Sequence, residues 1–348
     1  MGDRHSCLSL SPRKPDRQEC LSSISQRRRP IRARILASFL ILFAHQAAAS
    51  CGASSCPIDL HALGLTSSSP LVADLSFQYI DQNHLRGSRD LETEHHELQT
   101  INRLTTLQLS YLVAPRFQIS ATLPFVSRSH RHIAVDTGEL ERWHFGAFGD
   151  AALQGRYRLY QSTTSPASDS FWISAGVKLP TGARHESNGE EDAEVTIQPG
   201  SGSTDVFAGA TWQSGWLRNT ALKGEMGHTT LIPFFASVTL RRNGRGTNRY
   251  RKGDELQVNA GSEYPINSRV NVLGQINLRQ ASKDSIGDTF ENPGLTGGTH
   301  LYVSPGLRIT LGRGLSAYTY VQLPVYEHIN GAQLVSRRNL LVGIQDRF

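Results

Sequence analysis

The chain has 348 residues, a formal net charge of +6 and a sequence pI near 9.3. Residues 1–34 contain nine basic and three acidic residues, so that 27 basic and 27 acidic residues remain in the rest of the chain. The basicity therefore belongs to the beginning of the chain. Because the remainder is neutral, its charge gives no reason to predict a nucleic-acid partner.

Residues 1–49 have the order of a secretory signal peptide with a long basic n-region. The basic run Arg27–Arg34 precedes the apolar run Ile35–Ala44, and small residues follow at Ala47–Ser50. Ten apolar residues are too few to cross about 30 Å of hydrocarbon as a helix, so we expect a cleaved signal rather than an anchor. The true start codon and the cleavage site stay open.

Residues 50–70 are interpreted as a short cysteine-containing segment and linker. Cys51 and Cys56 are close together in a chain that the leader marks for export, which predicts a disulfide between them. Lipidation of Cys51 is the alternative. Metal binding is not favoured, because no His or carboxylate lies between the two thiols.

After the leader no run of eighteen apolar residues occurs, so no helical span is predicted. Apolar and polar residues instead alternate with the period of a strand. Residues 106–113, for example, place Leu107, Leu109, Tyr111 and Val113 on one face. Twelve strands are predicted near 72–82, 100–114, 116–126, 147–160, 171–180, 203–213, 232–242, 254–264, 268–280, 298–311, 315–324 and 337–348.

An even number of strands of about ten residues predicts a closed antiparallel barrel over residues 71–348, because an open edge in lipid would leave backbone groups unpaired. A soluble sandwich or lipocalin-like barrel is the alternative, since alternation alone does not say which face is wet. The leader, the strand number and the short turn at Ala114–Pro115 between long loops favour the membrane barrel. We therefore predict an all-β transmembrane barrel of the bacterial outer-membrane type.

The last strand supports the same prediction. Leu340, Val342, Ile344 and Phe348 share one face, and the chain stops on the aromatic residue. This ending is similar to the signal that the barrel-assembly machinery recognises. We expect the strand to close the barrel by pairing with 315–323 on one side and with 74–82 on the other.

Three blocks of sequence resemble an outer-membrane family. Gly149–Tyr160, Ile173–Gly182 and Gln198–Ala210 occur in that order and are similar to stretches of the family labelled "MetA-pathway of phenol degradation", often called simply transporter. The resemblance implies an outer-membrane barrel that passes small, often apolar or aromatic, compounds. It implies no catalytic residues, and we expect no cofactor.

The predicted function is passive passage of small solutes, with outer-membrane lipids, the assembly machinery and a solute as partners. Polar residues of the inward face are the candidates to line the pore, although pairing and filling of a narrow barrel is the alternative role for each. The solute, the oligomeric state and whether the lumen is open or plugged by residues 50–70 stay open. The pore candidates are Asp150, Gln154, Arg156, Arg158, Lys178, Asp205, Gln257, Asn259, Glu263, Asn271, Gln275, Asn277, Arg279 and Arg308.

Two other functions compete with a channel: an outer-membrane lipid hydrolase and a non-conducting structural barrel. A hydrolase needs a nucleophile and a base within hydrogen-bond reach. His300 and Ser304 share a face but lie about 13 Å apart along a strand, so we predict no catalytic residue and no enzyme. The histidines at 95, 96, 130, 132, 144 and 185 are expected in loops, and no metal site is predicted.

Overall fold

The computed structural model describes residues 57–59, 70–86, 97–133, 138–162, 169–189, 191–220, 228–285, 287–288 and 295–348. The predicted signal peptide and the cysteine pair Cys51 and Cys56 lie outside these residues. Within them, no helix has the length and apolar character needed to cross a membrane.

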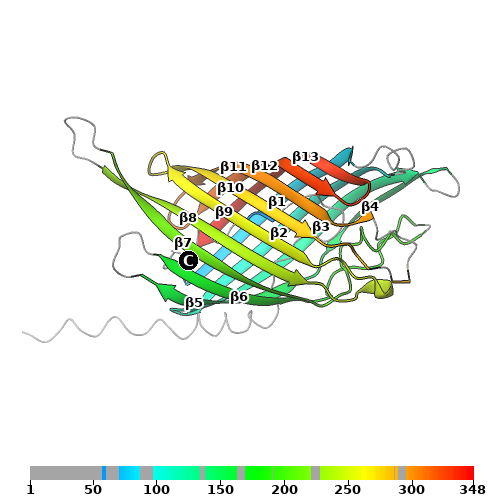
Figure 1. The fold of residues 1–348 in the computed structure, drawn as a ribbon, viewed down its shortest axis with the longest axis horizontal. Coiled ribbons are helices and arrows are strands. Elements are labelled where there is room, and N and C mark those ends of the chain that lie inside the picture. The colour runs from blue at the N-terminus through cyan, green and yellow to red at the C-terminus, as the bar shows by residue number, and fades with distance from the viewer. Residues whose placement is uncertain are drawn as a thin grey trace, which may run out of the picture. The chain divides into compact units, whose positions relative to one another are not determined.

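The described chain forms one antiparallel sheet whose strands are strongly tilted (Figure 1). A single short 3-10 turn, η1 (Thr247–Arg249), interrupts the described β-structure. The strands are β1 (Leu71–Arg86), β2 (Glu97–Ala114), β3 (Phe117–Ile133), β4 (Leu140–Phe148), β5 (Ala152–Gln161), β6 (Ser170–Lys178), β7 (Asp205–Thr220), β8 (His228–Arg242), β9 (Glu255–Pro265), β10 (Val270–Ala281), β11 (Gly298–Thr310), β12 (Ser316–Ile329) and β13 (Gln333–Arg347).

These thirteen strands fill twelve positions in the wall. β3 pairs with β5 along Phe117–Thr122 and with β4 along Phe125–Ile133, so that β4 and β5 succeed each other in one position. β1 pairs with β2 on one side and with β13 on the other, and β2 also pairs with β3, which closes the sheet. The predicted fold class, a closed twelve-strand antiparallel barrel, is confirmed. The single strand expected over 147–160 was wrong, because the backbone leaves the ladder between Phe148 and Ala152.

Side-chain burial identifies the wet face. Leu75, Leu153, Val206 and Ile344 point outward and keep 47–54% of their surface exposed. Their polar sequence neighbours, such as Gln345, are buried inside. A soluble barrel would place its apolar set inward, so this arrangement is that of a barrel surrounded by lipid.

The last strand closes the barrel in the predicted way. Ile344 of β13 lies opposite Leu75 of β1 and opposite Ala317 of β12. The start of β1 and the end of β13 therefore lie at the same end of the barrel. We call this the periplasmic end, as in outer-membrane barrels generally.

Two stretches are more regular than the sequence suggested. His130 and His132 lie in β3 and His144 lies in β4, so placing them in loops was wrong. Strand pairing continues there beyond the alternating apolar segment, because backbone ladders form as well in water as in lipid. His185 lies in the connection 179–204, and residues 95 and 96 are outside the described residues. The unclear stretch 213–232 is the β7–β8 hairpin, whose described ladder runs to Thr220 and His228 at the periplasmic end (Figure 1).

Candidate lumen site

The fourteen pore candidates occupy inward positions of the wall to different depths. Arg158, Asn271 and Arg279 are half-buried. The other eleven are buried: Asp150, Gln154, Arg156, Lys178, Asp205, Gln257, Asn259, Glu263, Gln275, Asn277 and Arg308.

The densest group surrounds Lys178 at the end of β6. Its Nζ lies 2.6 Å from an oxygen of Asp150 and 3.1 Å from an oxygen of Asp205, and it also donates to the Ser201 hydroxyl. The Ser203 hydroxyl donates to Asp205 at 2.7 Å. One cation is thus enclosed by two carboxylates and two serines. Because the site is buried, its charges have to be compensated locally. Here the groups that compensate Lys178 come from the wall and from the connections between its strands.

Close backbone approach holds this group together. The amides of Gly182 and Ser201 donate to the two oxygens of Asp150 at 3.0 and 2.8 Å. A Cβ on Gly182 would meet the Gly149 backbone at 2.6 Å, and one on Gly200 would meet Gly182 at 2.6 Å. Glycine is therefore required where the connection 179–204 crosses the residues between β4 and β5.

The same connection bends into the barrel. Ala193 and Ile197 pack against Trp143 and Phe145 of β4. The Ile197 carbonyl accepts a hydrogen bond from Arg128 on β3. The connection thus covers the inner face of β4 and narrows the lumen at the end opposite the periplasmic end.

A second charged pair lies toward the periplasmic end. Arg308 on β11 and Glu263 on β9 approach to 2.5 Å, and the Asn271 amide donates to the same carboxylate. Nearby, Tyr318 donates to both oxygens of Asp74 at 2.8 and 2.9 Å. Glu263 is thus paired with a cation on the wall, and Asp74 is held by hydrogen bonds from wall side chains.

Between these groups runs a ladder of amides. Asn277 donates to Asn259 at 2.8 Å and to Gln275 at 3.1 Å, and Ser304 donates to Asn277 at 2.7 Å. Toward the opposite end, Arg279 lies 2.6 Å from Glu255, which also accepts from Gln257. On β9, β10 and β11 the structure therefore joins the predicted residues Glu263 and Arg308, and also Asn259, Gln275 and Asn277, whereas Arg279 pairs with Glu255, which was not predicted.

The two arginines of β5 differ from these pairs. Arg158 donates to the Pro115 carbonyl at 2.5 Å and lies over the ring of Trp172, 5.2 Å from its centroid. Arg156, with only 5% of its surface exposed, donates to the Thr211 hydroxyl at 3.0 Å. Among the described residues its Nε has no hydrogen-bond partner, and no wall carboxylate forms an ion pair with it. Arg156 is thus a buried cation that the wall leaves uncompensated.

The residues 57–59 lie inside the barrel near Arg156. The backbone amide of Asp59 donates to Gln275 Oε1 at 3.2 Å, and Gln275 Nε2 donates to the Asp59 carbonyl at 3.0 Å. The Ser237 hydroxyl donates to the Asp59 carboxylate at 2.9 Å. The sequence left open whether residues 50–70 enter the lumen, and for these three residues the structure shows that they do.

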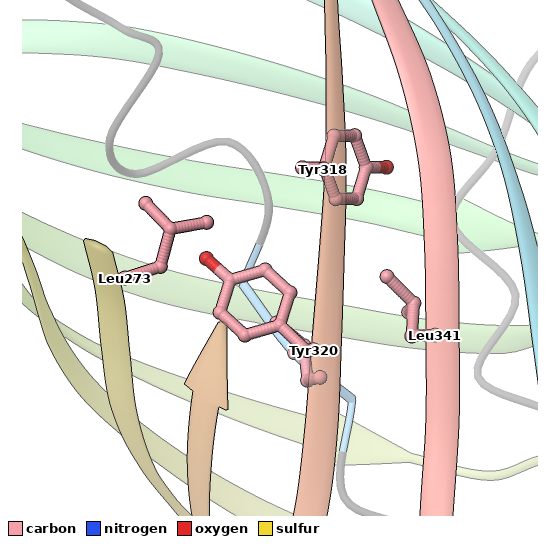
Figure 2. Packing of buried hydrophobic residues seen from close by; sticks show 5 residues of the cluster. Leu273, Tyr318, Tyr320 and Leu341 are labelled. Atoms are coloured by element: carbon pink, nitrogen blue, oxygen red, sulfur yellow. The ribbon is translucent and has the colours of Figure 1, made fainter. Parts of the chain in front are cut away.

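Ile58 packs on an apolar surface beside these polar contacts. It is buried with Leu273, Tyr318, Tyr320 and Leu341. Figure 2 shows Leu273 and Tyr320 directed toward each other from different strands, with Tyr318 and Leu341 on the other side of Tyr320. The surface is made by β10, β12 and β13. β12 and β13 pair directly, and β11 lies between β10 and β12.

One arrangement resembles a nucleophile and base. Thr100 and His130 share a contact of 2.8 Å, His130 lies 3.1 Å from His132, and His132 lies 2.9 Å from Glu141. These groups face the lumen, where both imidazole rings lie tilted against Trp143, whereas a lipid hydrolase needs them on the lipid face. His300 contacts Glu327, and Ser304 contacts Asn277, so the pair weighed from sequence is not formed. No three potential ligands among the described residues gather as a metal site.

Several lumen residues were missed by the sequence reasoning. Asp74 lies on the predicted polar face of its strand, so strand parity could have included it. Glu255 likewise lies on the polar face of its predicted strand, whereas Arg128 lies where β3 extends beyond its predicted end at residue 126. Asp59 and Ser201 lie in irregular segments, and nothing in their local pattern indicates that they face the lumen.

The residues of the predicted assembly signal are all exposed on the outer surface. Leu340, Val342, Ile344 and Phe348 keep 39–61% of their surface accessible. Their inward neighbour Leu341 is buried in the apolar surface described above.

No known protein family matches the sequence, and no curated protein sequence matches it. Solved structures do match the fold. The "COG4313 outer membrane channel from Pseudomonas putida F1" superposes with a TM-score of 0.54 at 12% identity, over 85% of this chain and all of that one. The transport unit of the autotransporter AIDA-I from Escherichia coli gives a TM-score of 0.45 at 12% identity, over 85% of this chain and 95% of that chain.

The "CymD monoaromatic hydrocarbon channel" gives a TM-score of 0.38 at 8% identity, over 88% of this chain and 99% of that chain. At such low identities, similarity extends to the fold only. The closed wall, the apolar exterior and the polar lumen agree with it: the chain is a β-barrel of the bacterial outer-membrane type.

Proposed function

We propose that this barrel is a passive outer-membrane channel for small solutes. The observation that carries the proposal is the presence of residues 57–59 inside the wall. Their backbone and side chains make hydrogen bonds to Gln275 and Ser237 in the lumen. A lumen that holds a peptide segment is wide enough, when the segment leaves, for a solute of similar cross-section.

The chemistry of the lumen supports the proposal. Amides, hydroxyls and charged pairs follow the inner face from Arg308 near the periplasmic end to Lys178 toward the other end. Water and small polar molecules can exchange hydrogen bonds with such groups as they move. A barrel with a purely structural role would have no need of a polar interior that also holds a separable segment.

The finer family assignment is part of the proposal. The blocks that resemble the "MetA-pathway of phenol degradation" barrels contribute Asp150, Lys178, Ser201 and Asp205 to one cluster, which supports treating them as one functional unit. On this resemblance we propose that the solutes include small apolar or aromatic compounds. We also propose that the exposed face of Leu340–Phe348 is the segment that the assembly machinery recognises.

Reconstitution tests the channel directly. Purified protein in planar bilayers should give discrete conductance steps, and proteoliposomes should swell in small solutes. Folded protein that passes neither ions nor small aromatics would contradict the channel and favour a structural barrel. Release of fatty acid from phospholipid by the same preparation would favour the hydrolase instead, and mutation of Thr100 to Val would test whether the lumenal Thr100–His130 pair is responsible.

A further inference from the structure

The contacts of residues 57–59 describe a recognition site as well as a plug. Asp59 presents a carboxylate to the Ser237 hydroxyl at 2.9 Å, and its charge interacts electrostatically with Arg156. Ile58, one residue earlier, fills an apolar surface. The segment therefore places one negative charge and one apolar group in a fixed relation.

The wall is complementary to both parts. On the polar side, Arg156 lacks a wall carboxylate within the described chain, whereas Arg308, Arg279 and Lys178 each have one at 2.5–2.6 Å. A buried guanidinium without a counter-charge is unfavourable, and a carboxylate is its strongest hydrogen-bonding partner. The polar side is therefore built for one anion.

On the other side, Leu273, Tyr318, Tyr320 and Leu341 offer aliphatic and aromatic surface. Gln275 joins the two sides, because its Nε2 donates both to the Asp59 carbonyl and to the Tyr320 hydroxyl at 3.2 Å. A ligand with an apolar body and a single carboxylate would satisfy the whole surface.

We infer that Arg156, Ser237, Gln275 and the apolar surface around Leu273 and Tyr320 form a lumenal binding site for small carboxylates with an apolar or aromatic body. Ile58 and Asp59 occupy this site as a built-in competitor. The inference rests on the proposed channel function and names the class of solute that the channel selects. A neutral hydrocarbon would leave Arg156 without a counter-charge. A phosphate dianion would bring two charges to one cation.

The test compares benzoate with benzyl alcohol, which has the same ring and no charge. Asp59→Asn removes the competing charge while keeping the size of the side chain. We expect benzoate to bind about tenfold more tightly to this variant, the change produced by about 1.4 kcal/mol. Binding of benzyl alcohol should not change. Asp192→Asn, on the exposed part of the 179–204 connection, is the matched control and should behave as the parent protein.

Arg156→Gln in the Asp59→Asn background should abolish the gain for benzoate. Equilibrium dialysis of the folded protein in detergent measures binding without any need for conduction, and current block by benzoate in bilayers measures the same affinity in the channel. Heat modifiability on gels checks that each variant is folded.

The outcomes separate the two proposals. Benzoate binding that tightens with Asp59→Asn and is lost with Arg156→Gln, in a protein that never conducts, retains the site and overturns the channel. The opposite outcome is a conducting protein whose affinity for benzoate is unchanged by Asp59→Asn and Arg156→Gln, or equals its affinity for benzyl alcohol. That outcome overturns the site and retains the channel.

Discussion

Lys178 and Arg156 are both buried cations on adjacent strands, yet they are balanced in different ways. Lys178 lies between Asp150 and Asp205, which belong to the wall and its connections. Arg156 has only the Thr211 hydroxyl as a described hydrogen-bond partner on the wall, and Asp59 of a separate segment interacts with its charge. A cation balanced within the wall stabilises the fold, whereas we propose that one facing a segment in the lumen can bind a solute when the segment leaves.

The largest expected effect is loss of the Lys178 cation. Lys178→Met leaves Asp150 and Asp205 buried and facing each other, and removing one partner of such a group costs about 3–5 kcal/mol. Urea unfolding of the barrel in detergent measures this loss. The matched triple variant Lys178→Met/Asp150→Asn/Asp205→Asn should recover most of the lost stability, because no charge is then stranded. An unchanged urea midpoint for Lys178→Met alone would contradict the role of Lys178 in stabilising the fold.

The second substitution is the corresponding one at Arg156. Arg156→Met strands no wall carboxylate, so we expect less than half of the stability loss of Lys178→Met in the same urea series. Its main effect should appear in the bilayer, where loss of a lumenal cation shifts the reversal potential in a KCl gradient toward cation selectivity. Equal destabilisation by the two substitutions, with no change of selectivity, would contradict the distinction between them.

A smaller effect should follow from loosening the segment itself. Gln275→Leu removes two hydrogen bonds to the Asp59 backbone, at about 1–2 kcal/mol in total, which is a factor of about 5–30 in occupancy of the lumen by the segment. The open probability of single channels should rise accordingly. Gln322→Leu is the control, since Gln322 is a buried lumenal glutamine on β12 that accepts from Asn339 at 2.9 Å. The same rise in both variants would point to a loosened wall.

The smallest effect is expected at a surface pair outside the membrane. Arg249 and Asp288 pair at 2.5 Å in the connections after β8 and β10, where both are exposed. The hydrogen bond from Arg249 holds the pKa of Asp288 below its usual value, so its carboxylate stays charged to lower pH than an isolated one. Arg249→Ala should return the pKa upward in an NMR titration. It should leave both the urea midpoint and the conductance unchanged, because exposed pairs are screened by solvent.

Much of the wall was predictable because a strand in a barrel has one wet and one lipid-facing side. Leu107 and Gln108, or Leu153 and Gln154, go to opposite faces through backbone geometry alone. The boundaries were less predictable. The extension of β3 to Ile133 and the break between β4 and β5 depend on pairing with neighbours. The local alternation of apolar and polar residues does not indicate which strands pair, so His130 and His132 were wrongly placed in loops.

The pore candidates show the same division. Parity indicated that Asp150, Lys178 and Asp205 share the inward face, but not that one ammonium group would be enclosed by both carboxylates. That depends on the register Ala152↔Lys178↔Asp205 and on a glycine-lined crossing of the 179–204 connection. The sequence left two alternative roles for every candidate, charge pairing within the wall and lining of the pore. These roles can be distinguished only when the partner of each residue is known.

The sequence by itself determined a period-two chain with twelve wall positions, each with one apolar and one polar face, because this property is local and repeats every second residue. Only the tertiary structure decided what the lumen contains. Asp59 meets Gln275 across 216 positions of sequence, and Ile58 meets a surface shared by three strands. Such meetings follow from the closure and register of the barrel, where each strand's position depends on all the others.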